Sequence, residues 1–155
     1  MSSQAEDVPL DLPLTVLGSV VLPGIEPAAC LVRRYARALL GPGFPGLYEL
    51  TVVASELFTN AVRHSRSGHL SRENGYGHVT MTFLTGDGML RLELADQGGP
   101  GTPRLTRPGD DSESGRGLQV VDALSLAWGA ERRGSGTVVW AEFAWPGCTV
   151  PQAGG

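Results

Sequence analysis

The sequence predicts an α+β fold, a two-layer sandwich of helices and strands, and three observations support this prediction. Apolar residues recur at spacings of three and four across 47–64, which is the period of an amphipathic helix. Apolar and polar residues alternate across 78–84 and again across 90–94, which is the period of half-buried β-strands. A second pair of apolar stretches flanks the glycine-rich residues 133–136, which predicts another hairpin.

The N-terminal part contains one strand and one helix. Leu12–Leu22 is rich in valine and ends at Pro23-Gly24, which is typical of a strand followed by a turn. Pro27 suits the first position of a helix, and Gly41-Pro42-Gly43 ends it. The apolar stripe predicted for this helix consists of Leu31, Val32, Tyr35, Ala38 and Leu39.

The helix predicted over 47–64 has an apolar face and a polar stripe. Its expected core residues are Leu50, Val53, Ala54, Leu57 and Ala61. Glu56, Asn60 and either Arg63 or His64 follow the same spacing on another face. Residues 68–77 are polar and predict a loop.

The central hairpin positions a carboxylate at the end of a strand. Its first strand is expected to bury Val79, Met81 and Phe83, and its second strand Leu90, Leu92 and Leu94. The second strand ends at Asp96, before the glycines of a loop. An acidic side chain at such an opening can accept a hydrogen bond from a ligand, although an Asp that starts an ordinary turn explains the pattern equally well.

Residues 100–114 have no periodicity, and a loop of this length within a domain is usually functional. We expect a lid over about 102–114, a short helix over 118–124 and a closing strand that contains Val139, Ala141 and Phe143. The sequence thus predicts one domain over 12–146, with flexible tails at 1–11 and 147–155.

The composition of the chain argues against several kinds of partner and location. The chain has 155 residues, a net charge of −4 and no basic run, so a direct nucleic-acid partner is not expected. No apolar stretch is long enough to span a membrane, and the polar, acidic N-terminus does not resemble a signal peptide. Cys30 and Cys148 form no metal-binding or disulfide pattern, so we expect a cytoplasmic protein.

All 12 basic residues are arginines, and this excludes several kinds of chemistry. The phosphate-binding loop of P-loop proteins, the eukaryotic-type protein kinase site and Schiff-base catalysis each require a lysine. A nucleotide site in this chain must therefore work without lysine.

Two further motifs contain residues that suit nucleotide chemistry. A carboxylate such as Glu56 can act as a general base, and the amide oxygen of Asn60 suits Mg²⁺. Gly115-Arg116-Gly117 immediately precedes the predicted short helix, where backbone N–H groups can bind an anion. The alternatives are a solvated polar helix face for the first motif and a flexible hinge for the second.

These motifs, in this order and together with Gly136-Thr137, resemble the four nucleotide-binding signatures of the GHKL ATPases, which include gyrase B, Hsp90, MutL and histidine kinases. The resemblance implies a Bergerat fold, with helices on one face of a mixed, largely antiparallel sheet. It implies that Asp96 reads the adenine amino group of ATP and that Asn60 holds Mg²⁺. The residues it implies for nucleotide binding are Asn60, Arg63, His64, Asp96, Gly98, Gly99, Gly115, Arg116, Gly117, Leu118 and Thr137.

Within this superfamily, a domain of this length that contains Glu56-Leu57 and Asn60-Ala61 resembles the bacterial anti-sigma-factor serine kinases, the RsbW-like family. That resemblance implies Glu56 as the catalytic base, an anti-anti-sigma protein as the phosphorylated partner and a sigma factor as the sequestered partner. A homodimer is possible. Glu113 and Ser114 stand where some members carry a phosphate-binding arginine, so Arg116 or a lid arginine could replace it. The alternative function is a non-catalytic, ATP-dependent protein-binding module.

Overall fold

The computed structural model describes residues 14–64, 68, 70–71, 75–98 and 113–147. The elements, in chain order, are β1 (Thr15–Pro23), the 3-10 helix η1 (Glu26–Ala28), α1 (Ala29–Leu40), α2 (Leu47–His64), β2 (Leu70–Ser71), β3 (Gly75–Tyr76), β4 (His78–Gly86), β5 (Met89–Ala95), α3 (Glu113–Leu124), β6 (Ala127–Arg133) and β7 (Gly136–Ala144).

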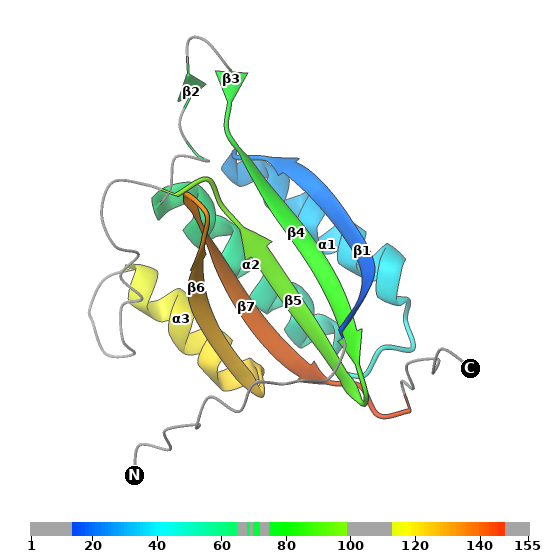
Figure 1. Cartoon of the computed structure of the whole chain (residues 1–155). Coiled ribbons are helices and arrows are strands. Elements are labelled where there is room, and N and C mark those ends of the chain that lie inside the picture. Colours follow the sequence, from blue (N-terminus) through cyan, green and yellow to red (C-terminus); the bar gives the residue numbers. More distant parts are fainter. Residues whose placement is uncertain (1–13, 65–67, 69, 72–74, 99–112, 148–155) are drawn as a thin grey trace.

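The main sheet has five strands in the order β1-β4-β5-β7-β6, and each neighbouring pair is antiparallel. Strands β2 and β3 pair separately as a short hairpin. Figure 1 shows α1, α2 and α3 together on one face of the sheet. The predicted α+β sandwich, with helices on one face of a largely antiparallel sheet, is therefore confirmed.

The core lies between this sheet and α2. All five residues predicted for the core face of α2 are buried, and Phe58 joins them. Strands β4 and β5 alternate as predicted, so that Val79, Met81 and Phe83 lie beside Leu90, Leu92 and Leu94 in one cluster. Burial of this apolar face stabilises α2 and fixes the direction in which its polar stripe points.

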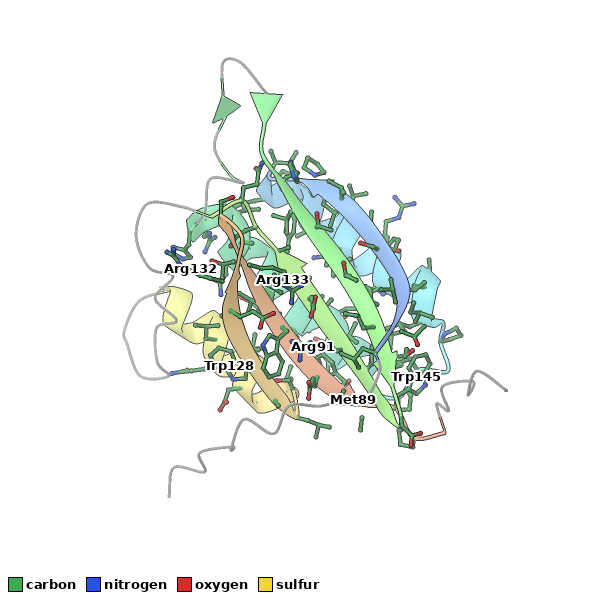
Figure 2. The ribbon with its side chains drawn as sticks, in the orientation of Figure 1. Met89, Arg91, Trp128, Arg132, Arg133 and Trp145 are labelled. Carbon is green, nitrogen blue, oxygen red and sulfur yellow. The ribbon has the colours of Figure 1, made fainter. Side chains whose placement is uncertain are left out.

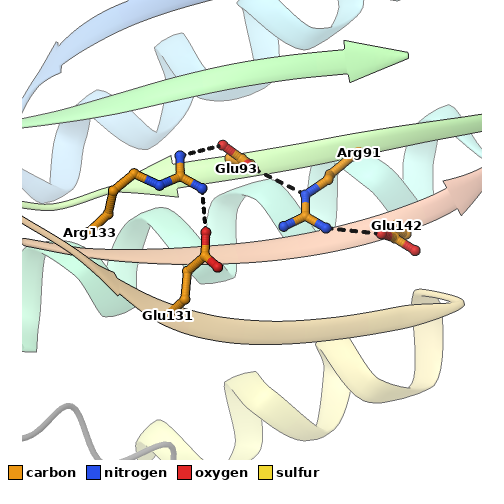
Figure 3. A network of polar contacts seen from close by, with 5 residues as sticks. All are labelled: Arg91, Glu93, Glu131, Arg133 and Glu142. Carbon is orange, nitrogen blue, oxygen red and sulfur yellow. Dashed lines mark hydrogen bonds and ion pairs between the residues drawn. The ribbon is translucent and has the colours of Figure 1, made fainter. Parts of the chain in front are cut away.

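The opposite face of the sheet carries a network of ion pairs across β5, β6 and β7 (Figure 3). Arg91 contacts Glu93 and Glu142, each at 3.1 Å, and Arg133 contacts Glu93 at 3.2 Å. Arg133 also bonds to Glu131, and this bond is the main cause of the raised pKa of Arg133. These polar side chains alternate with the buried leucines of β5 and satisfy one another on the face away from the helices.

The expected apolar stripe of α1 is partly wrong. The structure buries Val32 and Ala36 completely, whereas Leu31 is 40% exposed and Ala38 is also exposed. Positions 32 and 36 are one helical turn apart, and the cluster packs them toward the sheet and α2. Leu31 and Ala38 flank this line on the outer side of the helix.

Two other boundaries differ from the prediction. The last helix begins at Glu113 rather than Leu118, so Gly115 and Gly117 lie within its first turns. Glycine has a low helix propensity, which the packing of α3 against α2 overrides here. The predicted loop at 68–77 contains the two short strands β2 and β3.

Several predictions concern residues outside the described part of the chain. Most of the expected lid falls on 99–112, and the expected tails fall largely on 1–13 and 148–155. The lid, the tails and the single domain over 12–146 therefore stay predictions. Of the helices in the described segments, none combines the length and hydrophobicity that a membrane span requires.

Candidate nucleotide-binding site

The first half of the site lies where α2 and α3 meet. Glu56 and Asn60 lie one turn apart on α2, and both are partly exposed. A Cβ atom at Gly117 of α3 would lie 2.7 Å from Glu56 Oε2 and 3.9 Å from Asn60 Nδ2. The backbone of α3 therefore approaches both side chains, and glycine is the residue that permits this approach.

The side chains of Glu56 and Asn60 are not used to hold the fold together. Within the described segments, neither side chain has a hydrogen bond or an ion pair. A carboxylate and a carboxamide that lie side by side without such bonds can both turn to a ligand.

The second half of the site is built around Asp96, immediately after β5. Its Oδ1 accepts a hydrogen bond from the backbone N of Gly98 at 2.7 Å and another from the backbone N of Thr137 at 3.2 Å. The backbone N of Asp96 donates in turn to the carbonyl oxygen of Thr137 at 2.9 Å. No described donor reaches Oδ2, so this oxygen can accept a hydrogen bond from a ligand.

Two glycines bring the Asp96 loop against the turn between β6 and β7. Gly98 has a φ of 76°, and a Cβ atom there would lie 2.1 Å from the backbone oxygen of Ser135. A Cβ atom on Gly136 would lie 2.2 Å from the backbone oxygen of Asp96. The sequence motifs around Asp96 and Thr137 therefore meet in space, and Gly136 of the Gly136-Thr137 motif makes one of the close contacts.

The remaining predicted site residues are placed differently or not described. Arg63 contacts Glu26 of η1 at 2.8 Å, and both side chains are about half exposed. His64 is exposed at the end of α2, and Leu118 is buried in α3. No local pattern indicates Glu26 as the partner of Arg63, because the two residues belong to different elements and are 37 positions apart.

Gly115 and Arg116 lie in α3, but the side chain of Arg116 is outside the described part. Gly99 is outside it as well. The nucleotide roles predicted for these three residues, for Arg63 and for His64 stay predictions.

Comparison with known families decides the class of this site. The family model for the histidine kinase-like ATPase domain matches residues 26–143, which include both halves of the site. The chain belongs to this family. The predicted membership of the GHKL ATPases is thereby confirmed, and ATP is the ligand for which a histidine kinase-like ATPase domain is built. No curated protein has a matching sequence.

Solved structures support the same fold. The RsbU and RsbW domains of a Mycobacterium tuberculosis protein align with a TM-score of 0.58 and 21% identity, over 82% of this chain and 31% of that one. The blue-light activated histidine kinase of Erythrobacter litoralis EL346 aligns with a TM-score of 0.52 and 19% identity, over 80% and 42% of the two chains. Its histidine kinase domain aligns with a TM-score of 0.50 and 19% identity, over 77% and 60%. This histidine kinase-like ATPase domain thus spans less than two thirds of each of these structures.

The close approach at Gly117 leads to a testable prediction. In Gly117→Ala the added methyl group must displace the Glu56 carboxylate and fill space beside Asn60, so affinity for Mg·ATP should fall roughly tenfold, about the free energy of one hydrogen bond. Thermal stability should stay equal or rise, because alanine is the better helix former by about 1 kcal/mol. Calorimetric titration and a melting curve measure the two effects. Gln119→Ala on the exposed side of α3 is the control, and equal ATP affinity in both variants would contradict the proposed contact.

Proposed function

We propose that this domain is a protein serine/threonine kinase that transfers the γ-phosphoryl group of ATP to a partner protein. One observation carries the proposal: Glu56 presents a partly exposed carboxylate beside Asn60 and the start of α3, and no hydrogen bond from a described residue occupies it. A domain that only binds ATP does not need a free carboxylate in this position. A kinase needs one to accept the proton of the attacking hydroxyl group.

The two halves of the site suit the two ends of ATP. Asp96 Oδ2 would accept a hydrogen bond from the adenine amino group, and the neighbouring Thr137 is 6% exposed, which limits water near the base. The backbone N–H groups of the first turn of α3 would be available to the phosphates, and Gly117 lets this part of the helix come close to Asn60 and Glu56. Because different motifs would bind the adenine end and the phosphate end of ATP, the two ends can be tested separately.

The magnesium ion of Mg·ATP would be held by the amide oxygen of Asn60. Proteins bind Mg²⁺ through one or two side-chain oxygens together with substrate phosphates, and a single amide oxygen fits this pattern. When bound, the ion would neutralise the negative charge that develops on the phosphate groups during transfer.

Glu56 would take the proton of a serine or threonine hydroxyl as its oxygen attacks the γ-phosphorus. A new oxygen–phosphorus bond forms, the bond from the γ-phosphorus to the bridging oxygen breaks, and ADP leaves. The contribution of this chain is therefore to position the hydroxyl and to accept one proton. General-base catalysis of this kind accounts for roughly 10²–10⁴-fold of the rate.

We propose that the partner is an anti-anti-sigma protein and that the same domain sequesters a sigma factor in the cytoplasm. The support is the match of Glu56 and Asn60 to the RsbW-like sequence pattern and the shared fold with a structure that contains an RsbW domain. A homodimer is compatible with this role.

Phosphotransfer to candidate anti-anti-sigma proteins tests the proposal. The wild type, incubated with γ-labelled ATP and Mg²⁺, should label one of them on serine or threonine. If a candidate instead binds the domain only in the presence of ATP and is never labelled, the non-catalytic binding module is the better account.

The variant Asp96→Asn tests whether Asp96 binds the adenine ring. The amide oxygen can keep the bonds that Oδ1 now accepts, but an NH2 group then replaces the oxygen that would face adenine. The free energy of ATP binding should become less favourable by roughly 1–3 kcal/mol, with little change in the melting temperature. Calorimetric titration measures the loss, and an unchanged ATP affinity would rule out Asp96 as the adenine reader.

A further inference from the structure

Arg132 lies on the face of the sheet that carries the helices. The side chains of β6 alternate, and Trp128 marks this face because its Nε1 donates to Asp122 of α3 at 2.9 Å. Glu131 and Arg133 mark the other face, where they join the ion-pair network shown in Figure 3. Arg132 lies between those two residues in the strand, so its side chain is on the face of the sheet that carries the helices.

Arg132 continues the row of residues that forms the base end of the site. It is the direct antiparallel partner of Thr137, and Thr137 is hydrogen-bonded to Asp96 through both backbone groups. Directly paired residues lie on the same face of a sheet, and neighbouring strands are roughly 4.8 Å apart. The three residues thus form one row across β6, β7 and β5, with Arg132 about 10 Å from Asp96.

The same end of β6 lies beside the start of α3. The helix ends at Leu124 and the strand begins at Ala127, and the two elements pack against each other in opposite directions. Figure 2 labels Arg132 at one end of β6, and Figure 1 shows that this end lies next to the start of α3. Arg132 therefore lies in the Asp96 row, at the end of β6 that is next to the start of α3, the helix whose Gly117 approaches Glu56 and Asn60.

We propose that Arg132, on β6, binds the phosphate groups of the nucleotide through its positive charge. It does not contact the adenine base. This inference rests on the proposed nucleotide site. The chain has no lysine, so a side chain that is permanently cationic near the phosphates must be an arginine. Of the arginines of β5 and β6, Arg91 and Arg133 face the other side of the sheet. An arginine can form paired hydrogen bonds with phosphate oxygens, which are among the strong ones in proteins.

Neighbouring arginines of β6 allow a matched experiment. Arg132→Ala and Arg133→Ala remove the same charge from adjacent positions on opposite faces of one strand. Titrations of both variants and the wild type with adenosine, ADP and ATP would separate contact with the phosphates from contact with the base. Arg132→Ala should weaken ADP and ATP binding roughly tenfold to hundredfold, the range for hydrogen bonds to charged groups, and leave adenosine binding unchanged.

The controls keep the test decisive. The Arg133→Ala variant should bind all three ligands like the wild type. The Arg132→Lys variant should recover part of the affinity that Arg132→Ala loses. Melting curves without ligand should show that both alanine variants are folded. Wild-type affinity for ATP in Arg132→Ala, or an equal loss for adenosine, would overturn the inference. If the wild type binds ATP but transfers no phosphate, the kinase proposal fails while the role of Arg132 can still be measured.

Discussion

Glu56→Gln is expected to bind Mg·ATP like the wild type and to lose phosphotransfer by roughly 10²–10⁴-fold. Glutamine keeps the shape of the side chain and its hydrogen bonding, but it cannot accept the hydroxyl proton. Because the carboxylate makes no hydrogen bond to a described residue, its replacement should leave the unfolding free energy almost unchanged. Calorimetric titration gives the ATP affinity, and transfer of labelled phosphate to the partner gives the rate.

Glu49→Gln is the matched control for this experiment. Glu49 is an exposed glutamate in the first turn of the same helix, two turns before Glu56, and its substitution changes the net charge equally. It should retain both ATP binding and transfer. A Glu56→Gln variant that transfers phosphate at the wild-type rate would show that another group is the base.

Gly98→Ala is expected to lower the unfolding free energy by roughly 2–5 kcal/mol. A residue with a side chain costs roughly 1–2 kcal/mol at a positive φ, and forcing a methyl group into a packed site adds about 1–3 kcal/mol. Both terms apply, because φ is 76° and the added Cβ would lie 2.1 Å from the backbone oxygen of Ser135. Denaturant unfolding measures the loss, and ATP binding should weaken because the Asp96 loop must move.

Gly134→Ala separates these two terms. Gly134 also has a positive φ, 64°, but a Cβ there would meet no atom within 4 Å. This variant should therefore lose only about 1–2 kcal/mol. If both variants are destabilised equally, the close packing of the Gly98 loop on the turn between β6 and β7 is wrong.

The sequence predicted those elements whose apolar period is long and regular. Helix α2 begins and ends at the predicted residues, and Val79, Met81 and Phe83 of β4 are buried as expected. Such patterns reflect burial against a core, which the chain encodes locally. The start of α3 was missed because glycines at 115 and 117 oppose helix formation, and packing against α2 overrides that preference.

The site was predictable as a set of motifs but not as an arrangement. Glu56, Asn60 and Asp96 could be predicted as site residues from residue type and spacing, whereas Thr137 was predicted from the family resemblance. The contact of Gly117 with Glu56 joins two helices that are far apart in the chain, and no local pattern encodes it. The position of Arg132 depends on strand register, which becomes visible only when β6 and β7 are paired.

Calorimetric titration of the wild type with Mg·ATP and with Mg·GTP tests the central claim most directly. In the proposed arrangement, Asp96, Thr137, Asn60 and the start of α3 form one site for adenine nucleotides. The carboxylate oxygen of Asp96 can accept a hydrogen bond from the amino group of adenine but meets another acceptor, the carbonyl oxygen, on guanine. ATP should therefore bind at least roughly tenfold more tightly than GTP, which corresponds to one hydrogen bond. Equal affinity for the two nucleotides, or no binding of either, would contradict the account.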